Sequence, residues 1–350
     1  MALLITLLFI SLFFLILSGL ACNYATKDPI SRAFIYWGTS LLFILIAGLR
    51  EVGSDPDSIG YRNYYESDLI LLLAEPTFAF ISYIVRNIFG NFQFVLIIYA
   101  IIGVLIKYRA IVKLTDLWFL SLVIYFGNYF LLHEFTQIRA GVASGLFLLS
   151  IVPLSERRFW KFFSLIVLAI LFHYSSIILL PLWFLTNKHL NTLGKCILYL
   201  LIPIGIVFHF MNLDLLMAIP IETIKYKLEI YKLTQETASN ELNVFNLVYL
   251  FKYLTLYTLL YFYETICVKM KYFSILLKIY AIALFSFLAL SQNTIFAMRI
   301  SELLGIVEII LVPAFYYIIK ERVFGSVLVG VVAIVYLYIN IFYLILAQVF

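Results

Sequence analysis

Arginine and histidine side chains recur in this chain at places where the sequence is otherwise apolar. The first, Arg50, opens the sequence REVGSDPDSIGY, in which Gly53 permits a tight turn and Asp55, Asp57 and Tyr61 add polar groups. An arginine with neighbouring carboxylate and phenol groups can bind phosphate or sugar hydroxyls. The same composition is also typical of an ordinary charged loop at a membrane interface.

Two further motifs combine a cation with a turn or a helix start. Gln137 and Arg139 precede the small residues Ala-Gly-Val-Ala-Ser-Gly, a pattern that packs helices closely. Arg139 could bind an anion, or its guanidinium could simply reach the polar interface. His173 interrupts the apolar sequence AILFHYSSII. It could be a neutral side chain hydrogen-bonded to Ser175 or Ser176, or a general acid or base that faces an outer cavity.

A fourth motif lies near the C-terminus, where Arg299 and Glu302 stand three residues apart. That spacing places both on one face of a helix, where they could neutralise each other. Arg299 could instead reach a phosphate while Glu302 orients it. Three arginines and one histidine without a matching set of carboxylates favour an anionic ligand over a cation, because arginine suits multidentate phosphate recognition.

Membrane helices are the elements that must position these residues. Hydrophobic residues make up 65% of the 350-residue chain and charged residues 12%, against a soluble norm of roughly 45–50% and about 25%. A soluble core of this size cannot hide so much apolar side chain. The apolar stretches are continuous, whereas a β-barrel requires alternation. We therefore predict an all-α, polytopic transmembrane helical bundle of about 10–12 spans, built as one integral-membrane domain, 1–350.

The apolar stretches predict where the spans lie, and two regions are atypical. Spans are expected at 3–21, 31–49, 92–108, 117–132, 137–153, 195–211, 244–264, 272–290, 296–319 and 325–347. The first of these is favoured over a cleaved signal because it is long and has no positive residues before it. Residues 69–90 contain Glu75-Pro76, which suggests a shortened, re-entrant or interfacial helix. Residues 159–186 would cross the membrane twice as two short spans, or dip into it and return, with His173 at the midpoint.

Lysine and arginine in the short loops predict the orientation. By the positive-inside rule, the loop marked by Lys107, Arg109 and Lys113 is cytoplasmic, as are the others of its kind. This orientation predicts two larger outer loops, at about 50–68 and 212–243, and a smaller outer turn at His133-Glu134. The net charge of +5 comes mostly from short loops, so it bears on orientation and predicts no nucleic-acid partner. Three cysteines show no metal-ligand spacing.

The order of the four motifs resembles the EpsG family of bacterial exopolysaccharide proteins, relatives of Wzy-type O-antigen polymerases. That family shows an R-x-x-G-x-D element followed by a tyrosine, then Q-x-R, then F-H-x-S, then a late arginine in a helix. Here the second and third elements are Gln137 with Arg139, and Phe172, His173 and Ser175. In the first element the family places its aspartate four positions before the tyrosine. Asp57 has that spacing, whereas Asp55 has the spacing to the arginine, so either could take the role.

The resemblance implies a glycosyltransferase that polymerises undecaprenyl-pyrophosphate-linked repeat units at the outer face of the bacterial cytoplasmic membrane, for O-antigen, capsule or exopolysaccharide. It implies no cofactor, since the lipid pyrophosphate activates the sugar; the chain shows neither a nucleotide-binding motif nor a carboxylate cluster for a metal. Arg139 and Arg299 would stabilise the leaving group, and His173, Asp55 or Asp57 would be the base. Arg50, Gly53, Tyr61, Gln137 and Glu302 would bind substrate.

Other partners and functions stay open at this point. Tyr226, in the loop 212–243, could help to cover the cavity and contact the sugars. Membrane lipid surrounds the bundle, and a chain-length regulator is a further candidate partner. An O-antigen ligase-like transferase has the same arginine and histidine chemistry with a different acceptor. A flippase for lipid-linked sugars would need a polar path through the membrane, and an O-acyltransferase would need a cytosolic donor route; the sequence favours neither.

Overall fold

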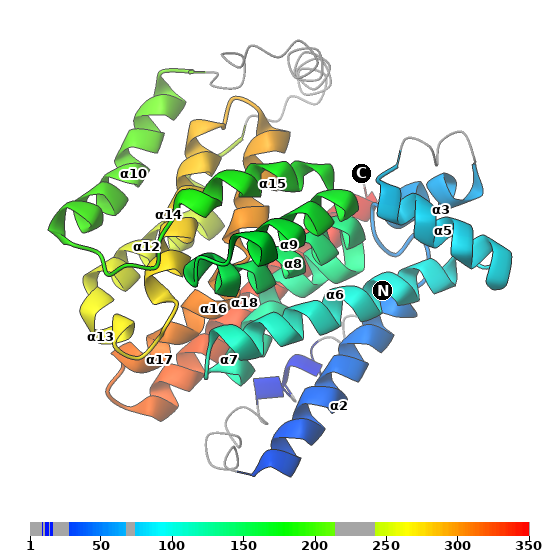
Figure 1. Cartoon of the computed structure of the whole chain (residues 1–350), viewed down its shortest axis with the longest axis horizontal. Coiled ribbons are helices and arrows are strands. Elements are labelled where there is room, and N and C mark those ends of the chain that lie inside the picture. Colours follow the sequence, from blue (N-terminus) through cyan, green and yellow to red (C-terminus); the bar gives the residue numbers. More distant parts are fainter. Residues whose placement is uncertain are drawn as a thin grey trace. The chain divides into compact units, whose positions relative to one another are not determined.

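The computed structural model describes residues 9, 11–13, 15, 16, 28–67, 74–213 and 242–349, with side chains of the last helix as far as Phe342. Within these ranges all regular secondary structure is helical, as Figure 1 shows. The chain groups into two compact units. Unit 1 comprises Met1–Trp183 with Ile309–Phe350, and unit 2 comprises Phe184–Glu308. The single domain inferred from sequence stays a prediction.

Five helices are long and apolar enough to cross a membrane, which confirms the predicted polytopic helical bundle. They are α2 (Pro29–Gly48), α6 (Gln93–Leu114), α8 (Ile138–Ser155), α10 (Thr192–Phe210) and the Arg322–Phe342 part of α18 (Arg322–Val349). Shorter apolar helices account for most of the remaining predicted spans. The predicted first span, 3–21, lies almost wholly outside the described residues.

Local sequence explains where several of these helices begin. The Asp28 carboxylate accepts hydrogen bonds from the Ile30 and Ser31 amides at 3.3 and 3.0 Å, and Pro29 follows as the first helical residue of α2. Asn191 caps α10 in the same way through the Gly194 amide. Asn246 caps α12 (Leu247–Tyr261) through the Tyr249 amide. Each cap satisfies an amide that the first helical turn leaves without a partner.

Unit 1 is centred on α6, which packs against α2 on one side and α8 on the other (Figure 1). Helix α8 also packs against α9 (Phe159–Phe172). The α7 helix (Trp118–Ile124) continues directly into η1, a π-helix over Tyr125–Thr136, and both pack against α18. Two shorter helices, α3 (Ser58–Glu66) and α5 (Pro76–Ile88), complete this part of the unit together with η2, a 3-10 helix over Tyr174–Phe184.

The described parts of the two atypical regions contain short helices. In the region 69–90, α5 has 13 residues, too few for a perpendicular span of about 20 residues. In the region 159–186, α9 ends at Phe172 and η2 begins at Tyr174, with His173 in an extended conformation between them. His173 is therefore held at a break between two short apolar helices.

Unit 2 is built around α14 (Phe273–Ala289), which packs against α10, α12 and α15 (Thr294–Gly305). The short α13 (Tyr263–Cys267) joins α12 to α14. A Cβ at Gly205 of α10 would lie 2.8 Å from the Leu288 Cβ, so glycine permits the close approach of α10 and α14. The predicted span 296–319 is divided into α15, α16 (Glu308–Leu311), η3 (Val312–Ala314) and α17 (Phe315–Ile318).

Two expectations about unit 1 are wrong. The outer turn expected at His133-Glu134 is part of the η1 helix, and both side chains are buried. Lys107, assigned to a cytoplasmic loop, lies inside α6 and is fully buried against Glu134. Hydropathy ends a span at the first charges it meets, whereas the α6 backbone continues to Leu114. Arg109 and Lys113, assigned to the same loop, also lie within α6, but both are exposed.

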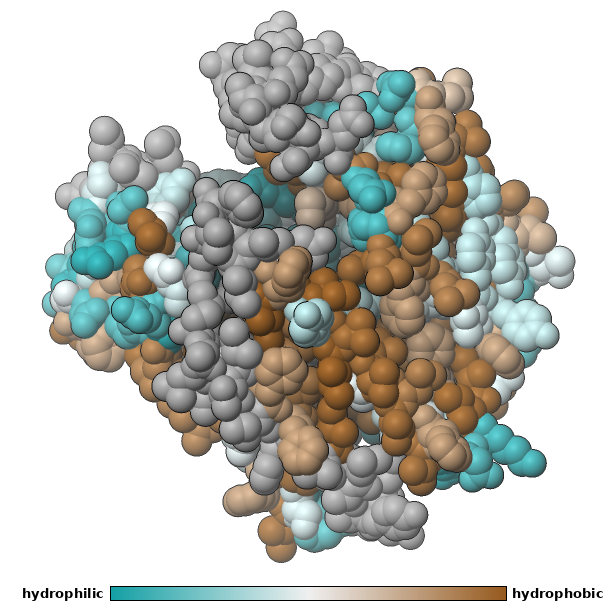
Figure 2. Space-filling view, turned by 180° about the vertical axis from the view of Figure 1, so that it is seen from behind, coloured by the Kyte–Doolittle hydropathy of each residue, from teal (hydrophilic) through white to brown (hydrophobic). Residues whose placement is uncertain are grey.

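Much of the surface is apolar. Figure 2 shows a broad hydrophobic area on one face of the molecule, with hydrophilic side chains gathered over α3 and α5 at the left of the view. Large exposed side chains such as Phe34 and Trp37 of α2 and Phe324 of α18 contribute to this apolar surface. Such a surface suits contact with lipid.

Candidate active site

Glu75, Arg139 and His173 meet in unit 1, although they lie far apart in sequence. Arg139 Nη1 forms an ion pair with Glu75 Oε2, and His173 Nδ1 lies 3.4 Å from Glu75 Oε1. The Glu75 side chain is 8% exposed, and those of Arg139 and His173 are about one-fifth exposed. One carboxylate thus contacts Arg139 and His173, two of the side chains that the sequence singled out.

Each of the three residues stands at the end of a helix. Glu75 immediately precedes Pro76, the first residue of α5, and is held in an extended conformation. Arg139 is the second residue of α8. His173 occupies the break between α9 and η2, and Thr77 Oγ1 ties α5 to that break by a hydrogen bond of 2.8 Å to the Leu171 carbonyl. All three side chains thus project from helix ends, and the packing of α5, α8 and α9 sets the distances between them.

Three aromatic rings surround the Arg139 guanidinium. Its central carbon lies 5.1 Å from the ring centre of Tyr61, 5.6 Å from that of Tyr64 and 5.7 Å from that of Phe78. Contacts of this kind stabilise a guanidinium and limit its motion. Arg139 is therefore held in place before any ligand arrives.

The charge state of Glu75 follows from these neighbours. Burial raises the pKa of its carboxyl, but the contact with His173 and the positive charge of Arg139 outweigh burial, so this pKa lies below its ordinary value. Glu75 is consequently a carboxylate at neutral pH. Because it faces His173 Nδ1, it favours the tautomer that carries the proton on Nδ1 and leaves Nε2 as the acceptor nitrogen.

The R-x-x-G-x-D element forms a compact turn that supports the site. Arg50 Nε pairs with Asp55 Oδ2 at 3.1 Å, and both side chains are buried. Asp55 Oδ1 accepts hydrogen bonds from the Asp57 and Ser58 amides at 3.1 and 2.9 Å, which caps the start of α3. Gly53 adopts φ +92°, a backbone conformation that favours glycine. This turn fixes α3, which carries Tyr61 and Tyr64.

Asp57 and Gln137 lie beside the site and are half-buried. Asp57 stands one residue before α3, and its carbonyl accepts the Tyr61 amide at 3.0 Å. Gln137 separates η1 from α8, and its carbonyl accepts the Gly141 amide at 2.8 Å. Asp55 is thus paired with Arg50 in the turn. Asp57 is the aspartate nearer to Tyr61 in the sequence.

The remaining predicted site residues lie in unit 2 or outside the described residues. Arg299 and Glu302 lie on α15 of unit 2, where Arg299 is exposed and Glu302 half-buried. Tyr226 lies outside the described residues. In the described part of the chain, no group of three or more histidine, cysteine, aspartate and glutamate side chains could hold a metal ion.

Glu75 is the main site residue that sequence reasoning missed as such. Glu75-Pro76 was noticed only as a sign of a shortened helix. A usable signal was present, since Glu75 is a single carboxylate at the end of the apolar stretch LILLLA. A carboxylate that closes such a stretch and precedes a helix-starting proline is a candidate partner for a buried cation.

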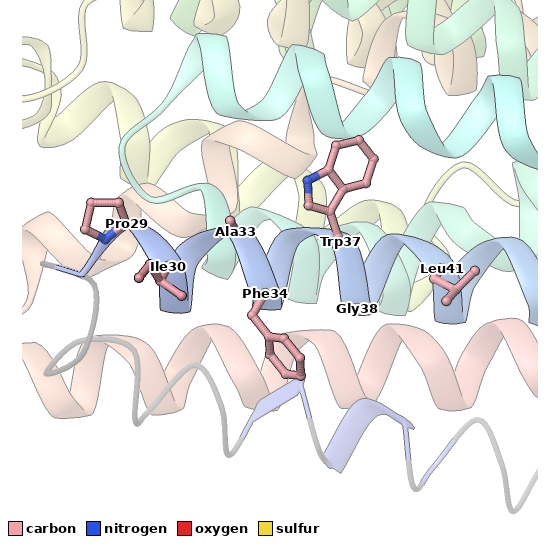
Figure 3. A pocket seen from close by; sticks show the side chains of 7 residues that line it. All are labelled: Pro29, Ile30, Ala33, Phe34, Trp37, Gly38 and Leu41. Atoms are coloured by element: carbon pink, nitrogen blue, oxygen red, sulfur yellow. The ribbon is translucent and has the colours of Figure 1, made fainter.

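A hollow on α2 provides a contrast with this site. Figure 3 shows the hollow, of about 630 Å³, and the residues that line it. They are Pro29, Ile30, Ala33, Phe34, Trp37, Gly38 and Leu41. None of these side chains is titratable, so the hollow has no acid–base chemistry, unlike the Glu75–Arg139–His173 cluster.

Together these observations define the class of the molecule: a multi-pass helical membrane protein with an arginine–histidine–carboxylate site built on helix ends. Residues 33–349, nearly the whole chain, match the model of the EpsG family. The chain therefore belongs to the EpsG family, a Wzy-like polysaccharide polymerase family. Comparison with curated proteins and with solved structures gives no match.

Proposed function

We propose that this protein polymerises glycan repeat units carried on undecaprenyl pyrophosphate, at the outer face of the bacterial cytoplasmic membrane. The observation that carries the proposal is the caged Arg139 next to the Glu75–His173 pair. A fixed guanidinium suits an anionic leaving group, and a histidine oriented by a carboxylate suits proton transfer from a hydroxyl. Membership of a polysaccharide polymerase family agrees with both.

The reaction assigns each residue a distinct role. A hydroxyl at the non-reducing end of the acceptor unit attacks the anomeric carbon of the nascent chain. The new bond joins that oxygen to the anomeric carbon, the bond from carbon to phosphate oxygen breaks, and the lipid pyrophosphate leaves with the electron pair. His173 Nε2 takes the hydroxyl proton, while Glu75 orients the ring and stabilises the imidazolium that forms.

The arginines supply the anion contacts in this scheme. Arg139 stabilises the charge that grows on the leaving pyrophosphate, and Arg299 provides a second cation for it. Asp57 is the alternative base. Tyr61 and Tyr64 hold Arg139 and offer hydroxyls to the sugars, and Arg50 with Asp55 maintains the α3 helix on which both tyrosines lie. Gln137, Glu302 and Tyr226 remain assigned to substrate binding.

Sizing of glycans from a strain that lacks this gene tests the proposal. Single repeat units on undecaprenyl pyrophosphate should replace long polymer, and the wild-type gene should restore the polymer. Arg139→Ala and His173→Ala should not restore it at equal protein level. Arg109→Ala is the matched control, since Arg109 is an exposed arginine at the far end of α6. It should restore the polymer fully.

Other outcomes would overturn the proposal and identify what replaces it. Full-length polymer that stays on its lipid carrier would indicate a ligase, because polymerisation would not need this protein. Repeat units trapped at the cytoplasmic face would indicate a flippase. Polymer formed normally by the Arg139→Ala chain would remove the anion site from the mechanism.

A further inference from the structure

A second charged cluster lies inside unit 1 and has no role in the scheme above. Lys107 of α6 places its Nζ 2.5 Å from Glu134 Oε1 of η1, and the same Nζ donates to the Gly141 carbonyl of α8. The exposed fractions of the Lys107 and Glu134 side chains are 0% and 1%. Beside them, His133 Nδ1 lies 3.1 Å from Ser144 Oγ of α8. One ammonium group thus joins three helices.

Three glycines make room for this cluster. A Cβ at Gly103 would lie 3.0 Å from Glu134 Oε1, and one at Gly145 would lie 3.2 Å from Lys107 Cγ. At Gly141 a Cβ would lie 2.6 Å from the His133 carbonyl oxygen, closer than real Cβ atoms come. Gly141 is therefore required for the approach of α8 to η1, and Gly103 and Gly145 ease the packing of α6 at this level.

Stability alone does not account for a buried pair of this kind. Apolar residues of similar volume usually replace a buried ion pair without loss of stability, or even with a gain. Ionisable groups inside helical membrane proteins are correspondingly rare and mark functional positions. The cluster therefore calls for a role other than holding the helices together.

The position of Gly141 indicates that role. Gly141 lies two residues after Arg139, within the first turn of α8. Its carbonyl is fixed from outside the helix by Lys107, while its amide bonds to the Gln137 carbonyl at 2.8 Å. A rotation of this turn would carry the Arg139 guanidinium away from Glu75.

We propose that Lys107 and Glu134 are positioning residues that hold the first turn of α8, and so keep the Arg139 guanidinium against Glu75. Glu134 orients the Lys107 ammonium, and that ammonium fixes the Gly141 carbonyl. The effect on catalysis rests on the proposed function of Arg139, whereas the effect on its position does not. A misplacement of about 1 Å can cost on the order of 100-fold in rate, so the pair would matter without touching substrate.

Thiol labelling tests the position of Arg139 without reference to activity. The background chain has its three natural cysteines, Cys22, Cys196 and Cys267, changed to serine. Arg139→Cys is introduced into it, and the rate at which 2-(trimethylammonium)ethyl methanethiosulfonate modifies this cysteine is measured in the purified full chain. Adding Lys107→Met with Glu134→Gln removes both charges and leaves no unpaired ion. We expect the modification rate to change at least about threefold, the scale of coupling through packed networks.

A matched control is available in unit 2, where Lys252 Nζ and Glu308 Oε2 form another buried pair at 3.2 Å. Lys252→Met with Glu308→Gln should leave the rate within about twofold of the parent chain. Gly145→Ala is a second variant, because its methyl group displaces Lys107 without removing a charge, and it should change the rate in the same direction.

The outcomes separate the two proposals. An unchanged rate in both the charge-free and the Gly145→Ala chains would overturn the positioning role. A change of equal size in the control pair would also overturn it, because the effect would not be specific to this cluster. Normal polymer in cells that carry Arg139→Ala would instead contradict the proposed function and leave the labelling result intact.

Discussion

Arg139 carries the most specific chemistry at the scale of single residues. Its guanidinium pairs with the Glu75 carboxylate and contacts the rings of Tyr61, Tyr64 and Phe78. Only about one-fifth of its side chain is exposed. A guanidinium in such surroundings does not need to reorganise when negative charge develops nearby, and that is the property which makes a fixed donor effective in a transition state.

Arg139→Lys tests whether the planar guanidinium matters as well as its charge. Lysine keeps one positive charge but lacks the planar fork with which a guanidinium contacts a carboxylate and a phosphate at once. We expect Arg139→Ala to lower polymer formation by at least about 100-fold, with Arg139→Lys intermediate. The measurement is polymer per cell at matched protein level, and a lysine chain as active as wild type would show that charge alone suffices.

Glu75 predicts a pH dependence of stability. Its pKa in the folded protein lies below the ordinary glutamate value of 4.5, so the carboxylate form is favoured by folding. The stabilising contribution is fully present above the unfolded value and is lost as the pH falls through the folded value. In detergent, the Tm of wild type should drop more steeply below pH 4.5 than that of Glu75→Gln. Parallel curves would contradict this assignment.

Helix ends and glycines matter most at the scale of elements. The site residues stand where α5 and α8 begin and where α9 stops, and α8 approaches η1 and α6 closely at Gly141 and Gly145. Gly141 and Gly38 provide a direct comparison, because both lie inside apolar helices, α8 and α2. A Cβ at Gly141 meets the His133 backbone, whereas one at Gly38 meets nothing within 4 Å.

Gly141→Ala should therefore destabilise the protein, whereas Gly38→Ala should not. The added methyl group must displace α8 from η1, at a cost of about 1–3 kcal/mol for overpacking. At Gly38 alanine should be neutral or stabilise α2 by up to about 1 kcal/mol, since glycine weakens a helix interior. Thermal unfolding in detergent measures both, and equal Tm values for the two variants would contradict the close packing of α8 on η1.

Orientation in the membrane is the property of the whole molecule on which the proposal depends. The turn that carries Arg50 and Asp55 must lie outside the cell membrane if the site is to meet an exported glycan. The loop between α8 and α9, which contains Arg157 and Arg158, must then lie in the cytoplasm.

Single cysteines at Glu51 and Glu156 test this orientation, since both positions are exposed. In intact cells, a membrane-impermeant maleimide should label Glu51→Cys, whereas Glu156→Cys should react only after permeabilisation. The background chain has its three natural cysteines changed to serine. The reverse pattern would place the site on the cytoplasmic side and contradict an outer-face polymerase.

The sequence by itself determined the class of this protein and part of its site. A chain with 65% hydrophobic residues can be stable only with lipid around it, and long apolar stretches must form helices there because no water satisfies the backbone. Arg139 and His173 were recognisable from sequence because a cation in an apolar stretch is costly and needs a reason.

Only the tertiary structure decided which partners those cations have. Glu75 and Arg139 are 64 residues apart, and Lys107 and Glu134 are 27 apart. No periodicity links positions at such separations, because their contact results from the packing of α5, α6, η1 and α8. For the same reason hydropathy placed Lys107 and Glu134 in loops on opposite faces: it scores each residue alone and cannot register that two buried charges neutralise each other.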